Sequence, residues 1–462
     1  MKVATSVSTH RQKLSRQIAG SLLFCLLWAT PSWAFAQLPG VNEYAEALVA
    51  GLTPHWGGPR VPHPLATPRP TESRVYLTDD LEPIRVHGAV AEDESRLRLV
   101  LDAASHAMTA LRAREWGVVA EDGGLGGSTE FDVYLDPTVD GYAVKSDGSL
   151  LWTYLDTESG FAVVNSTLSD RELEACTTAA YAETLLMSLD PAEAPAWRRA
   201  TAAYLTYLLT GSFGCHESRV LADVALSYQS AIPDSERVAE GRDAAAAGYF
   251  VALLDAQERG GEATFIRDMW QLTRQRTWEG HDLRASPDLW MAIEATFGFA
   301  HKELPDIIEQ ISVGRFLAGT PGAPNPGFRG LPHVTPHWIG TTSFADLPTR
   351  FAPADPPIET FGSGYALLRM GEEVPANTRV RVWMHGEFRV EWDLVVVPLD
   401  RNGHELSRVA APPRRTPRSY LEVLLPAHTD RVLVVVTNMS HRLPDADIPD
   451  YNARSFQLTL DR

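Results

Sequence analysis

Apolar residues recur at every third or fourth position over long stretches between residues 92 and 317. This spacing is typical of helices that bury one face, and it predicts a first helix from Glu92 to Glu115. Further helices are predicted at residues 170–189, 195–210, 218–230, 238–258, 262–275, 287–298 and 304–317. Asp170 suits the N-cap of the second helix, Pro195 the first turn of the third, and Gly211 its end. The central part of the chain is therefore expected to be mainly helical.

Alternation of apolar and polar residues predicts strands on both sides of this helical region. Phe131–Leu135 and Phe161–Asn165 read as strands, and a short strand is expected near Val75–Leu77. Beyond Gly364 the predicted strands are Tyr365–Met370, Arg379–His385, Trp392–Pro398, Tyr420–Leu425, Val432–Asn438 and Ser455–Leu460. Six or seven strands in about 100 residues are typical of an antiparallel β-sandwich. We therefore expect an α+β fold, a small sheet with helices followed by a β-sandwich.

Proline and glycine suggest where the domains divide. Residues 37–95 are rich in proline and are interpreted as an arm wrapped on the body, and residues 319–360 as a Pro- and Gly-rich linker. These segments leave a domain at 96–318 and a β-sandwich domain at 361–462. The glycine run at 123–127 is not followed by the Lys-Ser/Thr of a phosphate-binding loop, so we interpret it as an ordinary loop.

The first 36 residues have the pattern of a signal peptide. Basic residues precede a short apolar run from Ile18 to Trp28, and Ala34-Phe35-Ala36 before Gln37 fits a cleavage site. The apolar run is too short for a transmembrane helix. We therefore expect export to the periplasm or beyond the cell, with no membrane span.

Charge and cysteine content narrow the partners and the compartment. The net charge is −18, and removal of the predicted signal peptide takes away four basic and no acidic residues, which leaves −22. Such an acidic chain argues against nucleic acid or anionic membranes as partners. Cys176 and Cys215 remain after cleavage. They would approach each other if the helices at 170–189 and 195–210 are antiparallel, which predicts a disulfide, with two buried thiols as the alternative.

Residues 173–210 carry the most informative pattern. Two strands are followed by an alanine-rich helix, then Trp197 and a second helix that contains Ala202-Ala203-Tyr204. This order resembles a bacterial family of secreted metalloproteases of the gluzincin type, with a zincin-like fold and a C-terminal β-sandwich. The resemblance implies a zinc ion held by two histidines of an H-E-x-x-H helix and by a glutamate of the second helix.

The residues that the resemblance requires are missing. With Ala200 at the position of the second-helix glutamate, Ala179 falls on the first histidine, Ala180 on the catalytic glutamate and Glu183 on the second histidine. An earlier register would use Cys176, Thr177 and Ala180 instead. No histidine lies between residues 106 and 216. We therefore expect no zinc and no other cofactor at this place.

The replaced positions have both structural and functional interpretations. The three alanines would let two helices pack closely. Glu183 lies on an otherwise apolar helix face, so it needs a partner such as Arg198 or Arg199, unless the helix is rotated and Glu183 meets water. Large aromatic residues nearby would line either a core or the former substrate cleft: Tyr181, Trp197 and Tyr204.

Three functions remain open. The first is an inactive metalloprotease homologue that acts as a binding or structural protein, with a peptide or an envelope or cell-surface component as partner. The second is a hydrolase whose ligands come from His216, His281 or His301, or whose acid–base chemistry involves Glu183. The third is a carbohydrate- or surface-binding module in which Trp383 and Trp392 of the β-sandwich stack on sugar.

Overall fold

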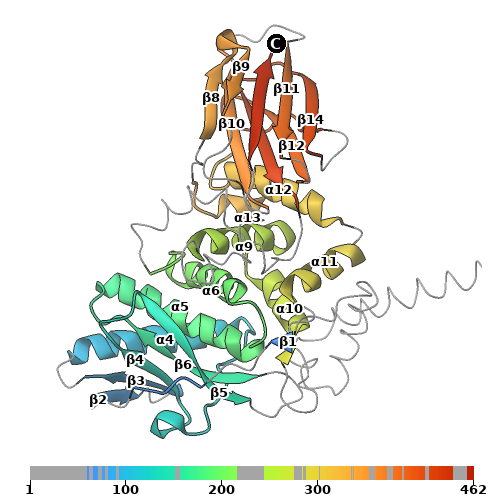
Figure 1. Cartoon of the computed structure of the whole chain (residues 1–462). Coiled ribbons are helices and arrows are strands. Elements are labelled where there is room, and N and C mark those ends of the chain that lie inside the picture. Colours follow the sequence, from blue (N-terminus) through green and yellow to red (C-terminus); the bar gives the residue numbers. More distant parts are fainter. Residues whose placement is uncertain are drawn as a thin grey trace, which may run out of the picture.

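The structure is a computed structural model (Figure 1). It describes residues 60–61, 66–70, 75–78, 82–89, 93–150, 157–215, 244–274, 283–284, 288–300, 302–334, 336, 338–352, 358, 361–371, 378–387, 390–411, 416–440 and 455–462. The predicted signal peptide at 1–36 and the predicted helix at 218–230 lie outside these residues. No helix of the described part is long and apolar enough to cross a membrane.

A five-stranded mixed sheet forms the N-terminal part. Its strands are β2 (Val75–Thr78), β3 (Ile84–Gly88), β4 (Phe131–Leu135), β5 (Tyr142–Leu150) and β6 (Glu158–Val164), in the order β2-β3-β4-β6-β5. Strands β3, β4 and β6 are parallel, and the two outer strands are antiparallel to their neighbours. Helices α4 (Glu94–Ala113) and α5 (Asp170–Leu189) share one apolar core with this sheet.

Strand β2 confirms the short strand predicted near Val75–Leu77, but the arm predicted at 37–95 needs correction because β3 was not predicted and both strands belong to this sheet. Strand β3 escapes sequence reasoning because two of its five residues, Arg85 and His87, are ionisable. The charged partners of these two residues are distant along the chain, so the sequence does not show that the two side chains are paired. The start of α5 also differs from the prediction. Ser169 is its N-cap and forms a capping box with Glu172, so Asp170 is already inside the helix.

The remaining helices follow the predicted ranges closely. They are α6 (Pro195–Thr210), α9 (Ala244–Arg259), α10 (Thr264–Thr273), α11 (Leu289–Phe299) and α12 (Leu304–Leu317). The short α13 (Pro326–Arg329) was not predicted and lies in the segment interpreted as a linker. Pro195 opens α6, and Gly211 closes it in the left-handed conformation, as predicted. The predicted disulfide between Cys176 and Cys215 is confirmed and joins α5 to the segment after α6.

The C-terminal part is a sandwich of two sheets. One has the order β13-β12-β15-β10-β8 and the other the order β14-β11-β16-β9. Their strands are β8 (Trp338–Ser343), β9 (Thr349–Phe351), β10 (Ser363–Arg369), β11 (Arg379–Gly386), β12 (Trp392–Leu399), β13 (Val409–Ala410), β14 (Arg418–Leu424), β15 (Arg431–Asn438) and β16 (Phe456–Asp461).

Two features of the sandwich differ from the sequence analysis. Residues 319–360 are not a linker, because β8 and β9 of this segment each belong to one of the two sheets. Pairing is mostly antiparallel, but β8 runs parallel to β10. Both strands are short and partly exposed, so the Pro- and Gly-rich composition around them hid their alternation.

The sandwich and the helical part share one apolar core. Tyr365 of β10 donates its hydroxyl hydrogen to the carbonyl oxygen of Ser312 in α12, at 2.7 Å. Phe361 packs edge-on against Trp290 of α11, with 5.1 Å between ring centroids. A continuous cluster of buried residues runs from the N-terminal sheet through the helices to β10, β12 and β15. The five-stranded sheet of the sandwich is therefore covered on both faces.

Close packing between α6 and α9 yields a stability prediction. A Cβ added to Gly248 of α9 would lie 2.7 Å from the Ala203 Cβ and 3.1 Å from the Ala200 carbonyl oxygen. Gly248→Ala should therefore lower the free energy of unfolding by about 1–3 kcal/mol, despite the higher helix propensity of alanine. Gly298 of α11 has no atom within 4 Å of the same position, so Gly298→Ala should be neutral or stabilise by up to about 1 kcal/mol.

Urea unfolding of the two variants beside the parent chain measures this difference. Equal stability of the two variants would contradict the close contact of α6 and α9.

Candidate functional site

Helix α5, which carries the predicted motif positions, is enclosed by protein. Every side chain from Ala175 to Leu189 is buried, and α4, α6, β5 and β6 all pack against the helix. Thr177, Thr184 and Ser188 donate their hydroxyl hydrogens to the carbonyl oxygens four residues earlier, at 2.7, 2.8 and 3.1 Å. Ala179, Ala180 and Glu183 therefore face packed protein.

Glu183 has two partners that hold its buried carboxylate. Tyr142 of the edge strand β5 donates its hydroxyl hydrogen to Oε2 at 2.8 Å, and Nε of Arg199 in α6 lies 3.5 Å from Oε1. Arg198, the other predicted partner, instead donates to the carbonyl oxygens of Pro191 and Glu193. Burial, together with the nearby charge of Glu183, raises the pKa of Tyr142 well above its ordinary value, so the phenol remains a hydrogen-bond donor.

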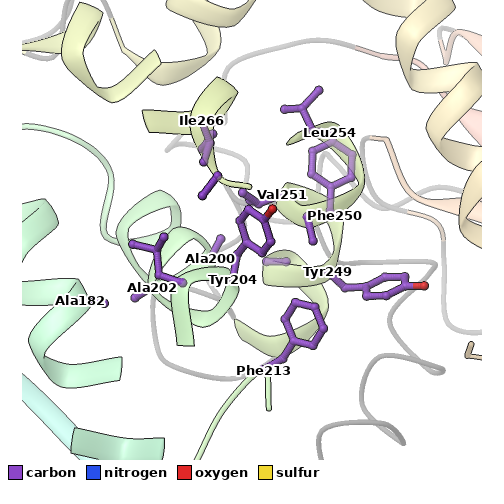
Figure 2. Packing of buried hydrophobic residues seen from close by; sticks show 14 of the residues in the cluster. Ala182, Ala200, Ala202, Tyr204, Phe213, Tyr249, Phe250, Val251, Leu254 and Ile266 are labelled. Carbon is purple, nitrogen blue, oxygen red and sulfur yellow. The ribbon is translucent and has the colours of Figure 1, made fainter. Parts of the chain in front are cut away.

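Ala200, at the position of the missing third ligand, belongs to the contact between α6 and α9. The backbone of Ala200 lies where any side chain at Gly248 would collide with it. Figure 2 shows Ala200 and Tyr204 among buried residues of α9 such as Val251 and Phe250. A longer side chain at residue 200 would have to displace this packing. The interpretation of the alanines as close-packing residues fits this geometry.

The three aromatic residues named as candidate cleft positions lie in the core. Tyr181 packs edge-on against Phe131 of β4, with 5.4 Å between ring centroids, and Trp197 edge-on against Trp290 at 5.0 Å. Tyr204 donates its hydroxyl hydrogen to Asp255 Oδ2 at 2.9 Å. All three side chains are almost completely buried. Their helical spacing therefore reflects packing, and the assignment to a cleft surface is corrected.

Metal ligands are absent from this place by residue type. Within the described ranges, no three His, Cys, Asp or Glu side chains lie where they could hold a metal ion. The relocated ligands considered above, His216, His281 and His301, lie outside those ranges. Another histidine, His333, lies within the described ranges. Its Nδ1 lies 3.0 Å from the carbonyl oxygen of Ala318.

A second buried polar cluster lies on the opposite face of the sheet, and sequence reasoning missed it. Arg69 of the N-terminal arm sits among three aspartates. Its Nη2 is 2.8 Å from Oδ2 of both Asp122 and Asp147, and its Nη1 contacts Asp132. His87 Nε2 lies 2.7 Å from the other oxygen of Asp132. The aspartates come from β4, β5 and a loop, so the cluster fastens the arm to the sheet.

The neighbouring carboxylates keep Arg69 charged. Burial would lower the pKa of Arg69, but the hydrogen bond and charge of Asp147 and the charge of Asp132 raise it above its ordinary value. Burial raises the pKa of Asp122. Gly126 of the glycine run makes room for the cluster, because a Cβ there would overlap Asp132 and lie 2.7 Å from Arg69 Nη1. The run at 123–127, predicted to be a loop, ends in a short 3-10 turn at Leu125–Gly127 and has a packing role.

A third buried carboxylate joins the loop between α5 and α6 to α11. Glu193 accepts hydrogen bonds from the backbone N–H groups of Leu289, at 2.7 Å, and Ala194, at 2.9 Å. Burial and the charges of Asp190 and Asp288 raise its pKa well above the ordinary value. The Glu193 carboxylate therefore holds the loop that precedes α6 in place, and this structural role explains its burial.

Comparisons with known proteins do not place the chain in a family. No family model and no curated protein matches it. Among solved structures, the pre-peptidase C-terminal domain of a Bacillus anthracis collagenase is 6% identical, with a TM-score of 0.18, and the match covers 26% of this chain and 93% of that domain. The periplasmic g-type lysozyme inhibitor PliG of Aeromonas hydrophila is 12% identical, with a TM-score of 0.15, over 27% of this chain and 96% of PliG.

A third match is the insecticidal delta-endotoxin Cry8Ea1 of Bacillus thuringiensis, at 14% identity and a TM-score of 0.14, over 24% of this chain and 19% of the toxin. Likenesses at these TM-scores carry no argument about fold or function. The interpretation of the site therefore depends on its own geometry.

The Glu183 contacts predict non-additive effects on stability. Tyr142→Phe and Arg199→Met should each lower the free energy of unfolding by about 1–3 kcal/mol, because each leaves part of a buried carboxylate without a donor. In a Glu183→Met background the same changes should cost much less. Urea unfolding of these double-mutant cycles measures the coupling.

Arg198→Met is the matched control, since Arg198 donates to backbone oxygens that the Glu183 background leaves in place. Additive effects of Arg199→Met and Glu183→Met would show that the two side chains do not interact.

The Arg69 cluster predicts a pH-dependent defect. Arg69→Met should destabilise by about 3–5 kcal/mol near pH 8, because it leaves buried aspartates without their cation. Burial already raises the pKa of Asp122 and the charge of Arg69 opposes this rise, so loss of Arg69 raises that folded-state pKa further and stability falls as the pH increases. The defect should therefore shrink at pH 5 in thermal unfolding.

Arg98→Met removes an exposed pair with Glu94 and should change stability by less than about 1 kcal/mol at either pH. A defect of equal size at pH 5 and pH 8 in Arg69→Met would argue against this electrostatic explanation.

Proposed function

We propose that the protein is an exported, non-catalytic homologue of zincin-like metalloproteases that acts as a binding or structural protein. Support comes from the order of elements. Strands β4 and β6 are followed along the chain by the adjacent helices α5 and α6. The resemblance rests on this order of two strands and two helices, whereas β3, α4 and β5 are not part of it.

The single observation that carries the proposal is the state of the ligand positions. Ala179 and Ala200 have no donor atom, and both carboxylate oxygens of Glu183 are engaged by Tyr142 and Arg199. Zinc, which the resemblance implies, does not fit these residues, because a zinc site needs three or four converging N, S or O ligands. No catalytic step through a metal is therefore derived for this place.

The neighbouring edge of the sheet is also partly occupied. The backbone N–H of Thr67 in the arm donates to the carbonyl oxygen of Ser146 in β5, at 2.9 Å. Arg69 fastens the same segment to the sheet face. A peptide that added a strand beside β5 would compete with the arm at Ser146. This favours another surface of the protein as the place where a partner binds.

Metal content and peptidase activity test the proposal. The chain from residue 37 to 462, purified without chelators and dialysed against trace zinc, should hold far less than one zinc per chain by mass spectrometry. It should not cleave casein. The Glu183→Gln variant should give the same zinc content and the same absence of cleavage as the parent chain. About one zinc per chain with chelator-sensitive casein cleavage would overturn the proposal and favour the hydrolase with a relocated site.

A further inference from the structure

The outer face of the four-stranded sheet in the sandwich is open to solvent. Strands β11 and β14 alternate strictly between buried and more exposed positions, with Val380, Val382 and Met384 pointing into the sandwich core. The outward side chains of Tyr420 and Leu424 are 44% and 55% exposed. Within the described ranges, no helix or strand covers this face.

Two aromatic side chains lie side by side on this face, on the edge strand β14 and its neighbour β11. Trp383 of β11 and Tyr420 of β14 are directly opposite each other across the strands, with 5.2 Å between ring centroids and a tilt of 37°. Trp392, the other predicted sugar-stacking tryptophan, is fully buried and packs edge-on against Phe456. That part of the prediction is corrected, and Trp383 alone has an outward position.

Positive charge surrounds the aromatic pair. Outward positions of β9, β11 and β14 carry Arg350, Arg379, Arg381 and Arg418, together with His385. Only two carboxylates, Glu422 and Asp461, occupy outward positions of the same sheet. The face therefore has an excess of cations in a chain whose net charge is −18.

The partners of these arginines on the sheet do not neutralise all of their positive charge. Arg379 and Arg381 share one carboxylate, that of Glu422, and Arg350 contacts the neutral amide of Gln457. Among the described residues no carboxylate pairs with Arg418. An added anion on this face would gain Arg contacts without having to displace a paired carboxylate at Arg418.

We propose that the outer face of the four-stranded sheet binds an anionic polysaccharide. The sugar rings would lie on Trp383 and Tyr420, whose negatively charged ring faces attract the C–H groups of a pyranose. Carboxylates of the polymer would meet Arg418 and the neighbouring arginines. The strand spacing of about 4.8 Å places Tyr420, Trp383, Thr459 and Arg350 in one row of about 14 Å, which is long enough for an extended chain of several sugars.

Other occupants fit this face less well. A neutral glycan could stack on the aromatic pair, but it has no charged group that would pair with the arginines. A nucleic acid depends for its affinity on many phosphate contacts, more than the four arginines of this face can supply. The proposal does not depend on the α5 region, so zinc or peptidase activity there would overturn the proposed function and leave this surface unaffected.

Titration calorimetry of the chain 37–462 tests the proposal with oligomers of polygalacturonate and alginate as acidic probes and cellohexaose as the neutral probe. At least one acidic probe should bind. Its affinity should be lower at about 200 mM salt than at about 50 mM salt, because salt screens exposed charges over this range. Trp383→Ala and Tyr420→Ala should each raise Kd about tenfold. Arg418→Ala should raise Kd severalfold and reduce the salt dependence.

Tyr76→Ala is the matched control, because Tyr76 is an exposed aromatic residue of β2 in the N-terminal sheet. It should leave Kd unchanged. The proposal is overturned if neither acidic probe binds, if cellohexaose binds equally well, or if a single-stranded oligonucleotide binds more tightly than both acidic probes. Binding that survives Trp383→Ala and Arg418→Ala would also overturn it, by placing the site elsewhere.

Discussion

The enclosure of α5 on all sides from Ala175 to Leu189 is the constraint on which the helical part depends. A helix with no solvent-facing side must be built from residues that are apolar or small, or that satisfy their own polar groups. This explains the alanines, the hydroxyl groups bonded to carbonyls four residues earlier, and the disulfide at Cys176. A protease helix has the opposite requirement, because its metal and attacking water need a hydrated side. The buried stretch from Ala175 to Leu189 provides no such side.

Burial of carboxylates recurs across the molecule, and each instance is stabilised differently. Glu183 receives a phenol and a guanidinium, Asp132 receives Arg69 and His87, and Glu193 receives backbone N–H groups with a raised pKa. In each case the carboxylate joins elements that are distant along the chain. Some of the acidic residues that this chain has in excess are therefore buried, and they hold separate elements together. They fix the geometry of the arm, of β5 and of the entry to α6.

Sequence periodicity predicted most helices and sandwich strands, because packing on one face imposes a regular spacing. It failed where burial depends on distant partners. Strand β5 contains Lys145, Ser146 and Asp147, which do not alternate with apolar residues, so the Tyr142 donor to Glu183 could not be expected. The need for a partner of Glu183 was predictable, but the choice of Arg199 over Arg198 depends on the rotation of α6 about its axis. Arg69 lies in a proline-rich segment without periodicity, so its role was invisible.

The two sheets of the sandwich differ in a way that bears on binding. Strands β10, β12 and β15 are buried almost throughout, because the sheet they form lies between the sandwich core and α12. Strands β11, β14 and β16 alternate, because only one of their faces is covered. In such strands an inward aromatic residue is explained by the core, whereas the outward Tyr420 stays 44% exposed and the outward Trp383 is only partly buried. Their cross-strand contact with each other is worth about 1 kcal/mol at most, and a partner that covers them would gain the burial that folding leaves unused.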